Sequence, residues 1–217
     1  MIVIPTSVLT DLSGVGVARH IGTGGVLPAY LAQHPDVSID LRERLSSDIV
    51  RAVCEGQADI GIVAGEVHTD GLETIPYHRD RLVVAVSPEH PLARENTVPF
   101  VRTLKHEHVS LQEGTAIFLF VQQRAKELNE YLRMRIHVGN FEAACRMVEA
   151  GVGLCVLPES AACRHARTMR ISILRMSDAW AFRQMHLCIR SRASLPSFAQ
   201  ALVDRLAADA SSTIANG

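Results

Sequence analysis

The stretch RMVEAGVGLCVLPE, from Arg146 to Glu159, changes from a helical pattern to a strand pattern within a few residues. Its first half carries apolar residues at the spacing of one buried helical face. Gly151 is where that helix should end, because glycine readily adopts the left-handed conformation that other residues resist. Leu154–Leu157 is then a short apolar run closed by Pro158, which is typical of a strand buried on both faces. A helix that leads directly into a buried strand predicts an α/β fold.

A second passage from helix to strand, SSDIVRAVCEGQADIGIVAG, lies nearer the N-terminus. Ser46 or Ser47 can cap its helix, Gly56 should end it, and Ile60–Val63 has the pattern of a buried strand. A further strand pattern, Val37–Leu41, comes just before this helix. Strand, helix and strand within about 30 residues form a βαβ unit, which implies parallel strands and a right-handed crossover.

The rest of the chain continues the alternation of strands and helices. Thr115 precedes a long helical pattern from Ala116 to about Leu132, and Asn140 can cap the helix that leads into the opening stretch. Strand-like runs occupy Leu72–Tyr77 and Leu82–Ser87.

These patterns form two βαβ-type halves. Extended segments near Tyr77–Val84 and Arg175–Arg183 join them, so the sequence predicts two α/β subdomains with a cleft between them. In such sheets ligands bind at the carboxyl ends of the strands, where helix N-termini point free N–H groups outward.

Composition restricts the class of protein. The chain has 217 residues, of which 47% are hydrophobic and 21% are charged, as in globular proteins. Its net charge of −1 argues against direct binding of this chain to nucleic acid phosphates. No apolar run approaches the ~20 residues of a membrane span, and the N-terminus lacks the pattern of a secretory signal. Five cysteines without a CxxC pair fit a reducing cytoplasm. We expect no metal and no cofactor.

Three segments, VGNFEAACRMVEAGVGLCVLPE, HPDVSIDLRERLSSDIVRAVCEGQADIGIVAG and VAVSPEHPLA, together resemble the effector-binding domain of LysR-type transcriptional regulators. The resemblance runs from about His20 to about Leu206. It implies the type 2 periplasmic-binding-protein fold, in which two Rossmann-like α/β subdomains are joined by two crossover strands. It places subdomain I at residues 1–80 and 183–217, and subdomain II at residues 81–182.

The family resemblance also implies a function. Such a domain senses a small metabolite in the cleft between its subdomains and changes the geometry of a DNA-bound homodimer or tetramer. The apolar helix faces Val26–Leu31 and Ala144–Val148 are candidate dimer interfaces. We expect the family's N-terminal winged helix-turn-helix to be absent from this chain, because nothing before His20 is long enough to form it, so that DNA is contacted only through that missing domain.

Two alternatives come from other classes of protein. A stand-alone solute-binding protein for a transporter would share the fold, but the missing export signal disfavours it. An enzyme on the same fold is a third possibility. However, the glycine-rich VGVARHIGTGG does not follow GxGxxG or the P-loop pattern, and no GxSxG motif is present. We assign no catalytic residue.

The resemblance implies a set of effector-binding positions at the loops and helix starts. They are Thr10, Ser13, Ser46, Ser47, Ala64, Gly65, Gly114, Thr115, Ala116, Asn140 and Phe141. The physical argument is strongest for Ser46, Ser47 and Thr115, because a hydroxyl and unpaired N–H groups at a helix start favour an anion such as a carboxylate. The alternative is that these residues are only N-caps, each worth ~1 kcal/mol to stability. The sequence leaves both open.

Overall fold

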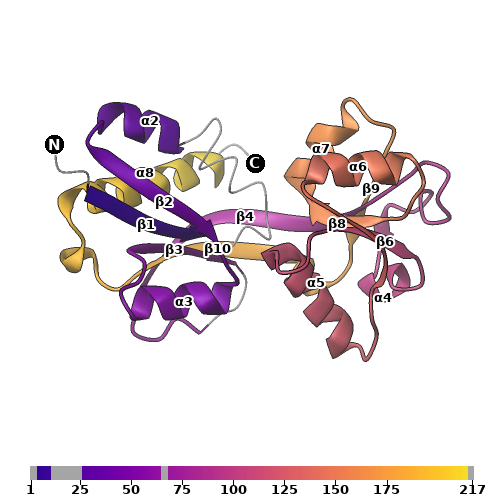
Figure 1. The fold of residues 1–217 in the computed structure, drawn as a ribbon, viewed down its shortest axis with the longest axis horizontal. Helices are drawn as coiled ribbons and strands as arrows, with labels where there is room; N and C mark the ends of the chain where they lie inside the picture. The colour runs from indigo at the N-terminus through magenta and orange to yellow at the C-terminus, as the bar shows by residue number, and fades with distance from the viewer. Residues whose placement is uncertain (1–3, 11–25, 65–67, 215–217) are drawn as a thin grey trace. The chain divides into compact units, whose positions relative to one another are not determined.

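The computed structural model describes residues 4–10, 26–64 and 68–214, and the chain divides into two compact units (Figure 1). Unit 1 contains the described residues up to Arg79 together with those from Arg183 onward, and unit 2 contains Asp80–Phe182. Strands alternate with helices in both units, which confirms the predicted α/β fold.

Unit 1 is built on three parallel strands in the order β2-β1-β3, with β2 at the edge. The helix α3 connects β2 to β3, and β1 lies between these two strands, so the predicted βαβ unit is present with parallel strands. The elements are β1 (Ile4–Thr10), α2 (Val26–Gln33), β2 (Val37–Glu43), α3 (Ser46–Cys54), β3 (Ile60–Ala64), the short helix η2 (Arg192–Ser194) and α8 (Ser197–Ile214).

Helices cover both faces of this sheet (Figure 1). Successive side chains of β3 point to opposite faces of the sheet, which explains the two layers. Ile60 and Ile62 pack in the core beneath α2 and α8, whereas Val63 packs in the core beneath α3. Gly61 lies on the α3 side, where an added Cβ would come within 2.5 Å of an Ile49 methyl carbon. Glycine at this position therefore allows α3 to approach the sheet closely.

The strand-like runs Leu72–Tyr77 and Leu82–Ser87 and the extended segment expected near Tyr77–Val84 all belong to one strand, β4 (Glu73–Val86). The polar residues between the two apolar runs belong to a continuous strand that passes from unit 1 into unit 2. A second strand, β10 (Phe182–Ile189), passes in the opposite direction along the chain and pairs with β3 and β4. Where β4 leaves unit 1, the Gln184 side chain donates to the His78 carbonyl at 3.1 Å.

Unit 2 contains one large apolar core surrounded by short strands and helices. The strands β8 and β9 both pair antiparallel with β4, and β6 pairs parallel with β7. The elements are β5 (Thr97–Val98), α4 (Phe100–Thr103), β6 (Glu107–Leu111), α5 (Ala116–Glu127), β7 (Arg133–Val138), α6 (Phe141–Glu149), β8 (Cys155–Pro158), α7 (Glu159–Ala166), β9 (Ser172–Met176) and the short helix η1 (Ala179–Ala181).

The opening stretch of the sequence folds as predicted. The helix α6 ends at Glu149, Gly151 has a φ of +74°, and every residue of β8 is buried. Gly153 has a separate role, because an added Cβ would lie 2.6 Å from the Glu107 carbonyl oxygen. This glycine lets the chain before β8 run against β6, to which Leu154 is joined by backbone hydrogen bonds of 2.8 and 2.9 Å.

The apolar helix faces that we expected at a dimer interface lie in the cores instead. Val26, Leu27 and Tyr30 are buried in unit 1, and Cys145 and Val148 are buried in unit 2. Sequence periodicity identifies an apolar helix face but does not say whether a sheet or a partner chain covers it. Among the described residues, no helix is long and apolar enough to cross a membrane.

Candidate functional site

The pairing of β6 with β7 brings two helix starts to one edge of unit 2. The strands are parallel, and their last residues, Leu111 and Val138, are paired in register. Each strand is followed by a short loop and a helix, α5 after β6 and α6 after β7. The predicted effector residues at these two helix starts therefore lie at the same carboxyl edge of the sheet, where open α/β sheets place ligands.

The start of α5 has no side-chain cap among the described residues. Thr115 occupies the N-cap position, but its hydroxyl donates to the Gln112 carbonyl oxygen at 2.8 Å and bonds no helix N–H. Gly114 has a φ of +87°, and nothing within 4 Å would oppose a Cβ there. The first residues of the helix, Ala116 and Ile117, are buried. An uncapped helix start of this kind can donate N–H groups to an anion.

The start of α6 is capped by Asn140, as predicted. Its side-chain oxygen accepts a hydrogen bond from the Ala143 N–H at 2.9 Å. The neighbouring Phe141 is buried in the unit 2 core. Asn140 is exposed, so its side-chain amide can also meet a ligand at this edge.

His137 is a residue at this edge that our sequence reasoning did not single out. It is the residue before the end of β7, its Nδ1 lies 3.0 Å from the Leu111 carbonyl oxygen, and its Nε2 lies 3.7 Å from a Glu113 carboxylate oxygen. The Phe118 ring packs edge-on against it at 5.3 Å between centroids. The sequence offered one signal for this residue. His137 lies near the end of a strand pattern, three residues before the predicted cap residue Asn140. His137 ties the β6–α5 loop to β7.

In unit 1 the predicted role of Ser46 as an N-cap is wrong. Leu45 holds the N-cap position of α3, and Ser46 is the first helical residue. The buried Ser46 hydroxyl accepts from the Ala64 N–H at 3.1 Å and lies 3.3 Å from the Ala64 carbonyl oxygen, to which it donates. It therefore holds the end of β3 against the start of α3. Ser47 is exposed, and Thr10 ends β1 in register with Glu43.

Two of the predicted positions, Ser13 and Gly65, lie outside the described residues. The structure thus brings together one group of predicted residues in unit 2, around Thr115 and Asn140, and another in unit 1, where Ser46 meets Ala64. That a single effector contacts both groups stays a prediction.

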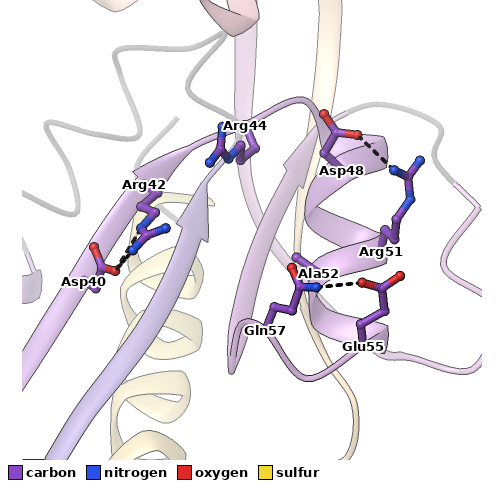
Figure 2. A pocket seen from close by; sticks show the side chains of 8 residues that line it. All are labelled: Asp40, Arg42, Arg44, Asp48, Arg51, Ala52, Glu55 and Gln57. Atoms are coloured by element: carbon purple, nitrogen blue, oxygen red, sulfur yellow. Dashed lines mark hydrogen bonds and ion pairs between the residues drawn. The ribbon is translucent and has the colours of Figure 1, made fainter.

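A hollow of about 370 Å³ lies in unit 1 between β2 and α3, and none of the predicted effector residues lines it (Figure 2). Its lining is Asp40, Arg42, Arg44, Asp48, Arg51, Ala52, Glu55 and Gln57.

The part of the chain that the structure describes contains no group of three or more His, Cys, Asp or Glu side chains that could hold a metal ion. All five cysteines are free. Burial raises the pKa of the Cys145 thiol to about 11 and that of Cys188 to about 12, so both are protonated thiols at neutral pH and are poor nucleophiles.

The fold matches that of bacterial regulatory domains. The regulatory domain of MetR, a LysR family regulator from N. meningitidis, superposes with a TM-score of 0.78 at 14% identity, over 94% of this chain and 93% of that one. The regulatory domain of CcmR from Synechocystis in complex with 2-PG gives a TM-score of 0.73 at 19% identity, over 95% and 97% of the two chains. The fold is therefore the type 2 periplasmic-binding-protein-like fold that these regulatory domains share.

The family model for the LysR substrate binding domain matches residues 22–211, and the chain belongs to this family. A probable RuBisCO transcriptional regulator from Trichormus variabilis is 26% identical over 157 residues, which are 68% of this chain and 46% of the relative. A probable cat1 operon transcriptional activator from Acinetobacter lwoffii is 33% identical over 63% of this chain and 48% of the relative. The chain thus spans about half the length of these curated relatives. These relatives and fold neighbours give no support to the transporter alternative.

Proposed function

We propose that this chain is the effector-sensing part of a LysR-type transcriptional regulator, and that its effector is a small carboxylate bound at the starts of α5 and α6. The domain acts in the cytoplasm, and it binds its ligand without transforming it. Binding favours one arrangement of the domain over others and so changes the population of oligomer geometries. DNA contact belongs to another part of the regulator, because this chain has a net charge of −1.

One observation carries the assignment of the site: the register of β6 with β7 puts the uncapped start of α5 and the Asn140 amide at one sheet edge. Both groups can donate hydrogen bonds to an anion, and the positive ends of two helix dipoles point to the same region. Two fold neighbours were solved with small molecules, CcmR with 2-PG and QuiR with shikimate, which supports a small-molecule effector here.

A thermal-shift screen of small carboxylates tests the proposal. A ligand at 100 times its dissociation constant adds ~2.7 kcal/mol to the free energy of unfolding. The informative variant is Asn140→Asp, because aspartate caps a helix as well as asparagine does but adds a negative charge. We expect the unliganded melting temperature to stay the same or rise slightly, and the affinity for a carboxylate to fall about tenfold or more, equivalent to ~1.4 kcal/mol.

The matched control is Asn96→Asp, which makes the same charge change at an exposed residue of unit 2 outside this edge. It should bind the ligand as the parent chain does. If Asn140→Asp also binds like the parent, the site is not at these helix starts. If only neutral or cationic metabolites raise the melting temperature, the carboxylate assignment is wrong while the family membership stands.

A further inference from the structure

The hollow between β2 and α3 is formed by two charged stripes (Figure 2). On β2, the period of two puts Asp40 and Arg42 on one face, and Arg44 continues it beyond the strand end. On α3, the outward positions at helical spacing form the second stripe, from Asp48 to Glu55. The helix packs over β3 and β1, so this face of the edge strand β2 stays exposed beside it.

Most charges in the hollow are already balanced. Arg42 pairs with Asp40 at 2.7 Å, and Arg51 lies 3.9 Å from Asp48. Two charges are left over. Within the described residues, Arg44 makes no ion pair, and the Glu55 carboxylate meets only the neutral Gln57 amide, at 2.9 Å. The lining therefore offers one uncompensated cation and one uncompensated anion.

These two charges lie at opposite ends of α3. Arg44 directly precedes its N-cap residue Leu45, and Glu55 is its C-cap residue. The helix dipole adds to the effect of these two charges, because the N-terminus of a helix favours a bound anion and its C-terminus a bound cation. A helix of nine residues rises ~13 Å, and Arg44 and Glu55 lie just outside its two ends.

We propose that this hollow is a second ligand site, which takes an elongated zwitterion with its anionic end at Arg44 and its cationic end at Glu55. An extended tripeptide has charged ends about 10 Å apart, and the long, exposed Arg44 and Glu55 side chains can span the remaining distance to them. A volume of about 370 Å³ lies at the low end of the ~300–1,000 Å³ of ligand pockets. None of the lining residues belongs to the predicted effector set, so this site is separate from the proposed effector site.

Three probes with the same tripeptide chain test the proposal: triglycine has both charges, N-acetyl-triglycine only the anion, and triglycine amide only the cation. Amide NMR spectra of the 217-residue chain at low salt should show saturable shifts with triglycine at residues that line the hollow, such as Ala52 and Gln57. The two singly charged probes should bind about two- to five-fold more weakly, as expected for the loss of one exposed ion pair. Added salt should weaken triglycine binding.

Two variants identify the ends of the ligand. Arg44→Gln should remove the preference for triglycine over triglycine amide, whereas Glu55→Gln should remove the preference over N-acetyl-triglycine. Arg205→Gln, on α8 and outside the hollow, should leave all three affinities unchanged. Equal shifts from the three probes, shifts that do not saturate or that fall elsewhere, or two hollow variants that bind like the parent would each overturn the proposal.

Discussion

At the scale of single residues, the Ser46 hydroxyl bonds both main-chain groups of Ala64 and is buried. Removing it leaves those buried groups without their partner, which costs about 1–3 kcal/mol. We therefore predict that Ser46→Ala lowers the free energy of unfolding by about that amount in urea denaturation. The exposed neighbour Ser47 is the control, because Ser47→Ala should change stability by less than about 0.5 kcal/mol. Equal effects of the two substitutions would show that the Ser46–Ala64 contact contributes little.

Gly153 and Gly139 provide a second pair of residues for comparison. A methyl group at Gly153 would meet the Glu107 carbonyl oxygen at 2.6 Å, and a main-chain atom cannot rotate away. A methyl group at Gly139 meets nothing within 4 Å. Gly153→Ala should therefore lose about 1–3 kcal/mol of stability through overpacking, whereas Gly139→Ala should be tolerated. Thermal denaturation of both variants checks this, and a stable Gly153→Ala chain would contradict the close approach to β6.

At the scale of elements, the burial of β6 makes stability depend on pH. His108 is buried there, with Nδ1 at 3.0 Å from the His106 carbonyl oxygen, and burial lowers its pKa to about 4. In the unfolded chain its pKa returns to about 6.5, so between these values only the unfolded state is protonated. Stability is therefore full above about pH 6.5 and falls as the pH drops towards 4.

The measurement compares urea denaturation of the parent with that of His108→Gln at pH 7 and pH 5. The parent should lose roughly 1–2 kcal/mol more than the variant over this interval, because the variant lacks the titrating ring. Burial also lowers the pKa of His90 and of His106, but these residues contribute to both chains and cancel in the comparison. An identical pH dependence of the two chains would show that His108 is not held neutral by β6.

At the scale of the whole molecule, we predict that the chain forms a homodimer. Three large apolar side chains in and before β7 are exposed: Leu128, Tyr131 and Ile136. Tyr131 is 72% exposed, and tyrosine is enriched in interfaces between proteins. Sedimentation velocity at micromolar concentration should show a dimer that Tyr131→Ser weakens, whereas Val101→Ser, at another exposed apolar residue of unit 2, should not. A parent chain that sediments only as a monomer would contradict the prediction.

Local patterns in the sequence were enough to predict the alternation of strands and helices and the α/β class, and the resemblance of three segments indicated the family. Gly151, Asn140 and the apolar run at the end of the opening stretch each act within a few residues of the chain, so their conformations follow from local preferences. The same reasoning placed Thr115 at a helix start.

Tertiary structure alone decided how the polar groups are used. The Ser46 hydroxyl bonds Ala64 instead of a helix N–H, because that contact depends on a partner far away in the sequence. The apolar faces of α2 and α6 contact a core for the same reason. The charge left over at Arg44 could not be deduced either, because it depends on which carboxylates the folded chain brings within reach.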